Sequence, residues 1–128
     1  MYARDRVARD LAIEIIEVRA GYARCEMTVA ERMLNGHDLC HGGYIFTLAD
    51  TAFAYACNAR NHVNVALQCS ISFAAPAREG DRLAAVCEER VKSNRTGTYD
   101  VTVTGASGAV LALFRGTSYQ VNARVVRD

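Results

Sequence analysis

Residues 34–58, LNGHDLCHGGYIFTLADTAFAYACN, carry a long helix pattern around which the rest of the chain is arranged. From Ile45 onward, apolar side chains recur at the i, i+3, i+4 spacing that buries one face of a helix. No proline interrupts the pattern, and asparagine and arginine follow it at positions 58–61, where helices commonly close. We expect one helix from about Gly43 to about Ala59.

Asp50 lies in the middle of this helix pattern. At 100° per residue it shares a side with Phe46, Phe53 and Cys57, at the margin of the buried face. A carboxylate there costs stability unless it is paired or used. Two interpretations stand: a structural carboxylate bonded to neighbouring backbone or to a hydroxyl such as that of Thr51, or a group that activates water or attacks a carbonyl.

Two glycines, Gly42 and Gly43, open the helix and give its first N–H groups no side-chain cover. Bare amides at the positive end of a helix suit an oxyanion. At the rise of an α-helix, Asp50 lies roughly 11–12 Å along the axis from Gly42, too far for both to act on one carbonyl. If both groups serve one reaction, a second subunit must bring its Asp50 to this turn, and a dimer shares its active sites.

The residues around the glycine turn offer further candidates. His41 could line a site or merely orient the turn, and Asn35 could orient water or a ligand carbonyl, although the Asn-Gly pair that it begins is also a common turn dipeptide. His37, Cys40 and His41 lie close in sequence, but a structural metal site needs a fourth ligand, and Asp38 is too near in sequence to supply it. We therefore expect no metal site.

Length, composition and charge limit the class of protein. The 128 residues, 51% of them hydrophobic and only one a proline, can bury a core without metal or disulfide, so one domain over 1–128 is expected. Fifteen basic against 14 acidic residues, net +1, give no reason to expect a nucleic-acid partner. No apolar run approaches the length of a membrane span, and the charged start MYARDRVARD lacks an apolar signal core. We expect a soluble, cytoplasmic protein without a membrane partner.

The five cysteines are expected to be reduced thiols, because their number is odd and no export signal is evident. Cys25 and Cys69 fall in the apolar phase of alternating strand patterns, and Cys57 falls beside the buried helix face. Ordinary use of cysteine as a small buried side chain accounts for all three.

Strand patterns flank the helix on both sides. The expected strands cover residues 11–18 and 23–29 before the helix, and 65–73, 83–91, 99–103 and 109–121 after it. The 65–73 strand, which Pro76 ends, alternates strictly, and its apolar side chains are expected on one face: Val65, Leu67, Cys69, Ile71 and Phe73. The simplest two-layer arrangement for this order is an α+β fold in which a curved antiparallel sheet wraps one long central helix.

Several familiar chemistries lack their sequence markers. The chain contains no G-x-S-x-G elbow, no G-x-x-x-x-G-K-[ST] loop, no G-x-G-x-x-G and no paired C-x-x-C. Lys92, Arg95 and Arg115 could meet the phosphates of a ligand, although basic residues near turns and strand ends are usually solvated surface.

The glycine turn and helix together resemble a known family. MLNGHDLCHGGYIFTLADTAFAYACN, residues 33–58, is similar to the signature of the PaaI-type hotdog thioesterases of phenylacetate degradation, and ALFRGTSYQV, residues 112–121, resembles their final strand. The resemblance spans nearly the whole chain from Leu11 to Val121, and the HGG and ADTAF segments are its specific part. It implies a hotdog fold, a catalytic acid at Asp50, an oxyanion amide at Gly42, and an orienting amide at Asn35, with His41 beside the turn.

The resemblance also implies a substrate and an assembly. The family pairs the acid of one subunit with the glycine turn of another, as a dimer or as a tetramer that is a dimer of dimers. Its substrates are acyl-CoA thioesters, with (hydroxy)phenylacetyl and related aryl or medium-chain acyl groups expected, and no separate cofactor. The residues expected to contact the substrate are Gly43, Phe46, Thr51, Arg95 and Thr96.

Two other functions stay open at this point. Some hotdog thioesterases add a serine or threonine in the strand after the helix, but residues 65–68 offer no hydroxyl, so the group that orients water must come from elsewhere, with Asn35 as a candidate. Hotdog hydratases and dehydratases use a histidine with an acid, which His41 would allow, although the D-x-N-P-x-H motif is missing. A non-catalytic acyl-CoA sensor is the other alternative, and the chain carries no DNA-binding segment to relay such a signal.

Overall fold

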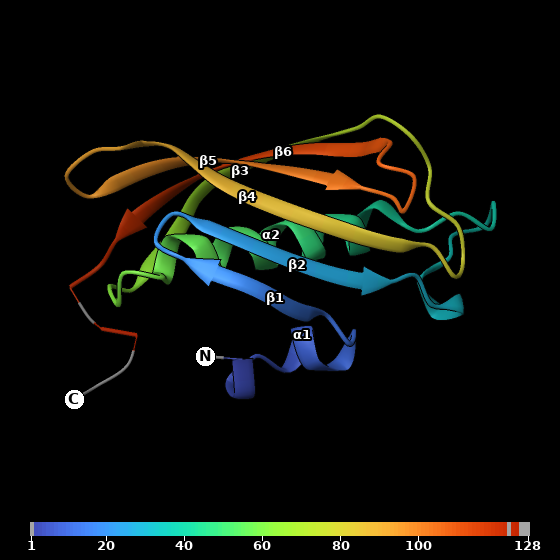
Figure 1. Cartoon of the computed structure of the whole chain (residues 1–128), viewed down its shortest axis with the longest axis horizontal. Helices are drawn as coiled ribbons and strands as arrows, with labels where there is room; N and C mark the ends of the chain where they lie inside the picture. The colour runs from blue at the N-terminus through green and yellow to red at the C-terminus, as the bar shows by residue number, and fades with distance from the viewer. Residues whose placement is uncertain (1, 123, 126–128) are drawn as a thin grey trace.

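One helix that runs the length of a sheet organises the structure. The computed structural model describes residues 2–122 and 124–125, so residues 1, 123 and 126–128 of the predicted domain lie outside the described part. Helix α2 (Gly42–Asn58) lies along one face of a curved six-stranded antiparallel sheet (Figure 1). The predicted α+β fold is therefore confirmed, and the predicted helix is correct to within one residue at each end. Of the described helices, none is long and apolar enough to cross a membrane.

The strand order places the strand that follows α2 at an edge of the sheet. The strands are β1 (Glu14–Arg19), β2 (Tyr22–Thr28), β3 (Asn64–Phe73), β4 (Arg82–Lys92), β5 (Thr96–Thr104) and β6 (Val110–Gln120). They lie in the order β1-β2-β4-β5-β6-β3, and every neighbouring pair is antiparallel. The short helices are η1 (Tyr2–Arg4), α1 (Arg6–Asp10) and η2 (Glu31–Met33). The first strand starts later than predicted because the chain turns at Ala12, which has a φ of 54°.

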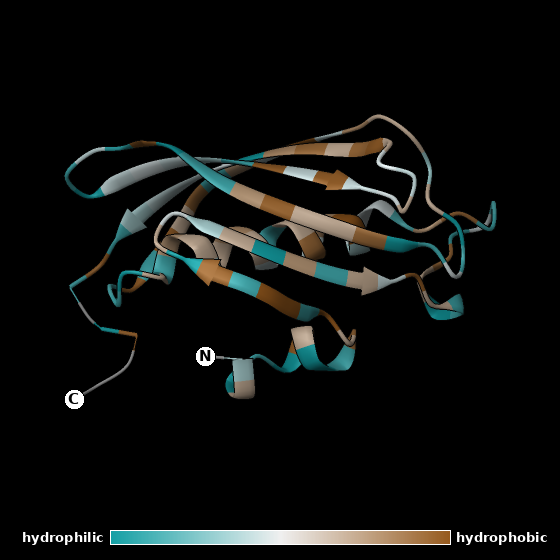
Figure 2. Cartoon of the chain, viewed as in Figure 1, coloured by the Kyte–Doolittle hydropathy of each residue, from teal (hydrophilic) through white to brown (hydrophobic). Residues whose placement is uncertain are grey.

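The core lies between α2 and the concave face of the sheet. Along β2 buried residues alternate with partly exposed ones, and Figure 2 shows the matching alternation of apolar and polar residues along this strand. On the helix side, the ring of Phe53 contacts Tyr99 and Phe114 at centroid distances of 5.5 and 5.7 Å. Gly116 on β6 lies directly beneath this ring, since an added Cβ there would come within 2.9 Å of two ring carbons of Phe53. The helix can therefore approach the sheet closely at this point.

The prediction that all five apolar residues of β3 share one face is wrong. The pairing of β3 with β6 shifts by one residue at Leu67, which forms a bulge. Residues that pair across antiparallel strands share a face. After the bulge, Ile71 pairs with the buried Phe114 and so faces α2, whereas Val65 before it pairs with the exposed Tyr119. The extra residue moves the second half of the apolar pattern onto the helix side.

The C-terminal end of α2 is closed by asparagines, as the sequence predicts. The side chain of Asn58 donates to the carbonyl of Ala54 at 2.8 Å, and its oxygen accepts from the N–H of Asn64, also at 2.8 Å. Asn61 adopts the left-handed conformation, with a φ of 62°. These bonds join the end of the helix directly to the start of β3.

The five cysteines are free thiols, and their burial differs. Cys25, Cys40, Cys57 and Cys87 are buried, whereas Cys69 on the edge strand β3 is only half-buried. Core packing therefore accounts for Cys25 and Cys57 as predicted, and less fully for Cys69.

Candidate active site

The first turn of α2 leaves one amide without a partner. His41 is the N-cap residue of the helix, and its Nδ1 accepts a hydrogen bond from the N–H of Gly43 at 3.0 Å. The N–H of Tyr44 donates to the carbonyl of His41 at 3.0 Å. Within the described residues the N–H of Gly42 meets no acceptor. The expectation that both glycine amides are uncovered is therefore wrong for Gly43 and holds for Gly42.

The loop before α2 is fixed by its own hydrogen bonds. The side-chain oxygen of Asn35 accepts from the N–H groups of His37 at 2.9 Å and Leu39 at 3.1 Å. The N–H of Cys40 donates to the carbonyl of Ala77 at 2.8 Å, which ties the loop to the rest of the chain. Because backbone donors hold the oxygen of Asn35, its NH₂ group is turned the other way. That NH₂ group meets no acceptor in the part of the chain that the structure describes.

Asn35 and Gly42 line the same cavity at the N-terminal end of α2. The cavity has a volume of about 490 Å³, within the range of small-molecule sites. Its other walls are mostly apolar side chains of the loop, of α2 and of the segment after β3: Leu39, Cys40, Ile45, Phe73, Ala74, Ala75 and Pro76. Two predicted catalytic residues, each with an N–H group that has no acceptor, thus open onto one largely apolar cavity.

Sequence reasoning missed the wall that β3 and its following segment contribute. An added Cβ on Gly42 would lie 2.9 Å from the Cζ of Phe73, so the aromatic ring packs directly on the glycine. The strand pattern predicts Phe73 as a strand residue, yet nothing near it in sequence indicates a contact with the start of α2. The contact joins two elements that meet only in the folded chain.

Asp50 is half-buried in the middle of α2 and lies outside this cavity. Among the described residues its carboxylate accepts no hydrogen bond and forms no ion pair; the hydroxyl of Thr51 instead donates to the carbonyl of Thr47 at 2.7 Å. Burial raises the pKa of Asp50, and the negative charge of Asp5 raises it further. The result is a carboxylate of increased basicity with no structural bond of its own.

The charge of Asp50 acts on a thiol of the edge strand β3 and on one of its own helix. Burial raises the pKa of Cys69 on β3, and the nearby charge of Asp50 adds to the rise. Burial also raises the pKa of Cys57, to about 12, and the charge of Asp50 makes a smaller contribution to this rise. In the part of the chain that the structure describes, no strand pairs with the outer edge of β3, and Val65 and Leu67 on this strand are exposed. An unpaired edge with exposed apolar side chains is a place where a second chain can add to a sheet.

Of the substrate-contact candidates on α2, the structure brings only Gly43 to the glycine turn. The Gly43 N–H is already bonded to His41. The ring of Phe46 packs edge-on against Phe114, with centroids 5.4 Å apart, and Thr51 is buried. Within one chain, Phe46 and Thr51 thus serve core contacts.

The basic candidates lie away from the cavity and have partners. Arg95, in the β4–β5 hairpin that also holds Thr96, donates to the carbonyl of Gln120 on β6 at 3.2 Å. Lys92 donates to two backbone carbonyls within the same hairpin. Gln120 pairs with Asn64 at the start of β3, which is the end of the sheet next to the C-terminus of α2. Arg95 and Thr96 are therefore at the opposite end of α2 from Gly42 in the same chain.

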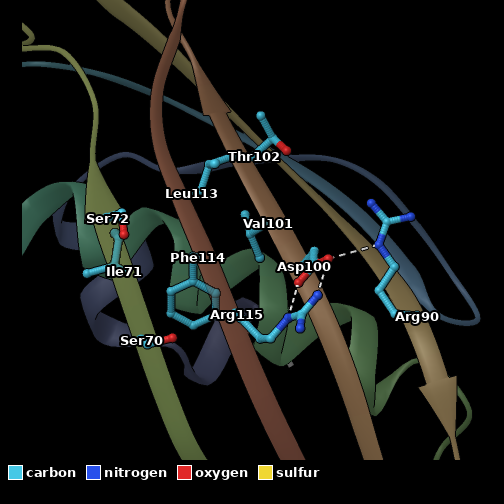
Figure 3. Close-up of a pocket in the computed structure, with 10 residues that line it drawn as sticks. All are labelled: Ser70, Ile71, Ser72, Arg90, Asp100, Val101, Thr102, Leu113, Phe114 and Arg115. Atoms are coloured by element: carbon cyan, nitrogen blue, oxygen red, sulfur yellow. Dashed lines mark hydrogen bonds and ion pairs between the residues drawn. The ribbon is translucent and has the colours of Figure 1, made fainter.

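A second hollow, of about 350 Å³, lies on the outer face of the sheet (Figure 3). Arg115 reaches Asp100 with two contacts of 2.6 and 2.9 Å, and Arg90 reaches it at 3.0 Å. The bond to Arg115 lowers the pKa of Asp100 most, and the bond to Arg90 lowers it further, against the opposing effect of burial. Both guanidinium groups are thus engaged with one carboxylate, on the face away from α2.

The residues around the turn do not gather as a metal site. Among the described residues, no three His, Cys, Asp or Glu side chains lie close enough together to hold a metal ion. His41 uses its Nδ1 for the helix cap, and the thiol of the buried Cys40 contacts the carbonyl of His41 at 3.7 Å.

Known proteins share both the sequence and the fold. A family model described as the thioesterase superfamily matches residues 37–112. The acyl-coenzyme A thioesterase PaaI of Escherichia coli K12 is 44% identical over 128 residues, which cover 100% of this chain and 91% of the relative. The solved structure of the E. coli PaaI protein from the phenylacetic acid degradation operon covers 98% of this chain and 91% of its own, with 44% identity and a TM-score of 0.96. A hypothetical thioesterase of Streptococcus pneumoniae TIGR4, solved with coenzyme A, is 27% identical, with a TM-score of 0.84, over 88% of this chain and 90% of its own.

A curved antiparallel sheet around one long helix, together with these matches, defines a hotdog thioesterase, a hydrolase of thioesters. Within this class the chain belongs to the thioesterase superfamily and to its PaaI-type acyl-CoA thioesterases. The family inferred from the HGG and ADTAF segments is confirmed.

The cap on Gly43 gives a test of the role of His41. Replacing it as His41→Ala removes the acceptor for the Gly43 N–H and is expected to lower the free energy of unfolding by about 1 kcal/mol. His41→Asn, which keeps a capping oxygen, is expected to recover most of this loss. Urea denaturation of both variants measures the effect.

Equal stability of His41→Ala and the wild type would contradict the capping role. Turnover separates the two interpretations of this histidine. If His41→Asn restores stability but not turnover, the imidazole does more than cap the helix.

Proposed function

We propose that residues 1–128 act as one hotdog domain that hydrolyses (hydroxy)phenylacetyl-CoA, or a related aryl or medium-chain acyl-CoA, to the free acid and CoA. Asp50 is the proposed base, Gly42 the oxyanion donor, and Asn35 the amide that orients water or the thioester. The active form is a homodimer or a dimer of dimers, in which Asp50 of one subunit acts beside the partner subunit's Gly42.

The observation that carries this proposal is the Gly42 N–H at the start of α2. It meets no acceptor among the described residues, it opens onto the cavity, and its neighbour Gly43 is capped by His41. An unpartnered amide at a positive helix end is suited to stabilising the negative charge that develops on a carbonyl oxygen. A hydrolase needs such a donor where the tetrahedral intermediate forms.

The proposed reaction moves one proton out and back. Asp50 takes a proton from water as the oxygen of that water forms a bond to the thioester carbon, and the Gly42 N–H donates to the resulting oxyanion. The intermediate collapses, the C–S bond breaks, and the departing CoA thiolate takes the proton from Asp50. In the alternative, the carboxylate itself attacks the carbon, CoA leaves, and water hydrolyses the anhydride. The raised pKa of Asp50 makes the carboxylate a better proton acceptor, as the base role requires, and equally a better nucleophile, as the alternative requires.

Asn35 is proposed as the orienting group for the water or the thioester. Its NH₂ group faces away from the loop bonds that hold its oxygen, and it lines the cavity with Gly42. Ala66, on the helix-facing side near the start of β3, carries no hydroxyl that could assist the acid. The polar group that a hydroxyl would have supplied is therefore assigned to Asn35.

The distance between Gly42 and Asp50 supports a shared site. Eight residues of α-helix separate them by about 12 Å along the axis, so one chain cannot bring both to one carbonyl. In a two-fold dimer, a contact of Asp50 with the partner subunit's Gly42 is repeated in reverse, and the two α2 helices run antiparallel. That arrangement carries the C-terminal end of α2, with Arg95 and Thr96 beyond it, towards the cavity of the other subunit. These residues are thus proposed to contact the CoA moiety from the second chain.

A coenzyme A thioester as substrate has support from two relatives. The E. coli relative is an acyl-coenzyme A thioesterase whose operon is that of phenylacetic acid degradation, and the S. pneumoniae relative was solved with coenzyme A. The cavity at the glycine turn fits this class, since its walls are largely apolar and it is lined by Asn35 and Gly42, whose side-chain NH₂ and backbone N–H meet no acceptor among the described residues.

The base role is tested with Asp50→Asn, which keeps the size of the side chain and removes its charge. We expect kcat for phenylacetyl-CoA to fall by about 10²–10⁴-fold, as is typical of a lost acid–base group. Release of free thiol measures turnover, and circular dichroism checks the fold. Turnover at the wild-type rate in a folded variant would refute the assignment.

The oxyanion role is tested by comparing Gly42→Pro with Gly42→Ala. Gly42 is the first residue of α2, where proline is tolerated, and the extended His41 before it, with ψ 135°, suits a following proline. Both variants add a Cβ against Phe73, but only proline removes the N–H. We expect kcat of Gly42→Pro to lie about 10²–10³-fold below that of Gly42→Ala. Equal kcat values would contradict the oxyanion role.

The shared site is tested by mixing two inactive variants. Asp50→Asn and Gly42→Pro subunits, unfolded and refolded together, form mixed dimers in which one of the two sites keeps both native groups. Random pairing is then expected to restore about one quarter of the wild-type rate. Each variant refolded alone is the control. No recovery, with mixed dimers demonstrated by mass spectrometry, would contradict a site divided between subunits.

A further inference from the structure

The aromatic ring at the wall of the cavity points to a determinant of acyl specificity. We propose that Phe73 selects aromatic acyl groups, by stacking against the aryl ring of a substrate whose thioester carbonyl is held at Gly42. This inference rests on the proposed function and adds to it the side chain that distinguishes aryl from aliphatic substrates.

Phe73 lies over the residue that carries the free amide. From an ideal Cβ position on Gly42, the Cζ of Phe73 is 2.9 Å away, and the Cε1 and Cε2 atoms are 3.2 and 3.3 Å away. The two Cε atoms are only slightly farther than Cζ, so the glycine lies over a face of the ring, near its tip, and not in line with its edge. One face of the ring is thus occupied by Gly42.

The rest of the ring is open. Phe73 is 53% exposed although it is a large apolar side chain that faces the helix side of β3. It is the one aromatic residue among the described residues that line the cavity, and most of the others are aliphatic. An exposed ring beside an apolar cavity becomes more favourable when a ligand covers it.

The position of the ring fixes the kind of acyl group it can recognise. A carbonyl bound at the Gly42 N–H lies next to Phe73, so an aryl ring separated from that carbonyl by a short linker reaches the side chain. Aromatic rings prefer offset or edge-to-face contacts, which contribute beyond the area that they bury. An aliphatic chain gains only the buried area, so loss of the Phe73 ring affects aryl substrates more.

The test compares kcat/KM for phenylacetyl-CoA with kcat/KM for hexanoyl-CoA. Phe73→Leu keeps an apolar side chain and removes the ring, and we expect it to lower the ratio of the two values by about 3- to 10-fold. Phe73→Tyr keeps the ring and is expected to keep the ratio. Leu113→Ala is the matched control, because Leu113 is 54% exposed, pairs with the neighbouring Ser72, and lies on the outer face of the sheet.

Two other results would overturn the inference. If Phe73→Leu lowers kcat/KM equally for both substrates, the ring only covers the site or forms a subunit contact. Sedimentation velocity would then detect the loss of a subunit contact. If the ratio is unchanged, the ring does not meet the acyl group. A wild-type protein that releases thiol from neither substrate would instead refute the proposed function, and this inference with it.

Discussion

The contact of Phe53 with Gly116 is the constraint on which the rest of the structure depends. A side chain at position 116 would collide with the ring, so the absence of a Cβ there lets α2 lie close against the sheet. With this depth fixed, the N-terminal end of the helix reaches the segment after β3, and the charge of Asp50 acts on Cys69 of the edge strand. Gly42 and Asp50 therefore lie on one helix whose position is set by core packing. Because the helix already holds them in place, little conformational entropy is lost when they bind a substrate.

In the first turn of α2, one backbone amide caps the helix with His41 and another is left available for a ligand. His41 satisfies one N–H of the first turn, and leaving all of them bare would weaken the helix end. The amide of Gly42 is not used by the cap. The hydrogen bonds that hold the oxygen of Asn35 leave its NH₂ group as a second donor in the same cavity. An anion site made in this way needs no charged side chain, because the partial charges of oriented amides are already in place before a ligand arrives.

The sequence predicts those parts of the fold that repeat locally. The spacing of apolar residues marks α2, and the same period puts Asp50 at the margin of its buried face, where the structure has it half-buried. The family could be inferred because the glycine turn and the acid lie in one stretch. The bulge at Leu67 could not be predicted, because apolar and polar residues alternate strictly through it in the sequence. Only the pairing with β6 reveals the extra residue. The contact of Phe73 with Gly42 was equally hidden, because it depends on where the end of an edge strand meets the start of a helix.

The face of Phe73 packed on Gly42 also ties the evolutionary histories of the two positions. A side chain gained at 42 would lie 2.9 Å from the tip of the ring, so the exposed ring of Phe73 must shift, or a smaller residue must replace it. A smaller residue at 73 requires no change at Gly42. Substitutions at the two positions are therefore expected to be coupled, with a side chain at 42 accompanied by a displaced or smaller group at 73.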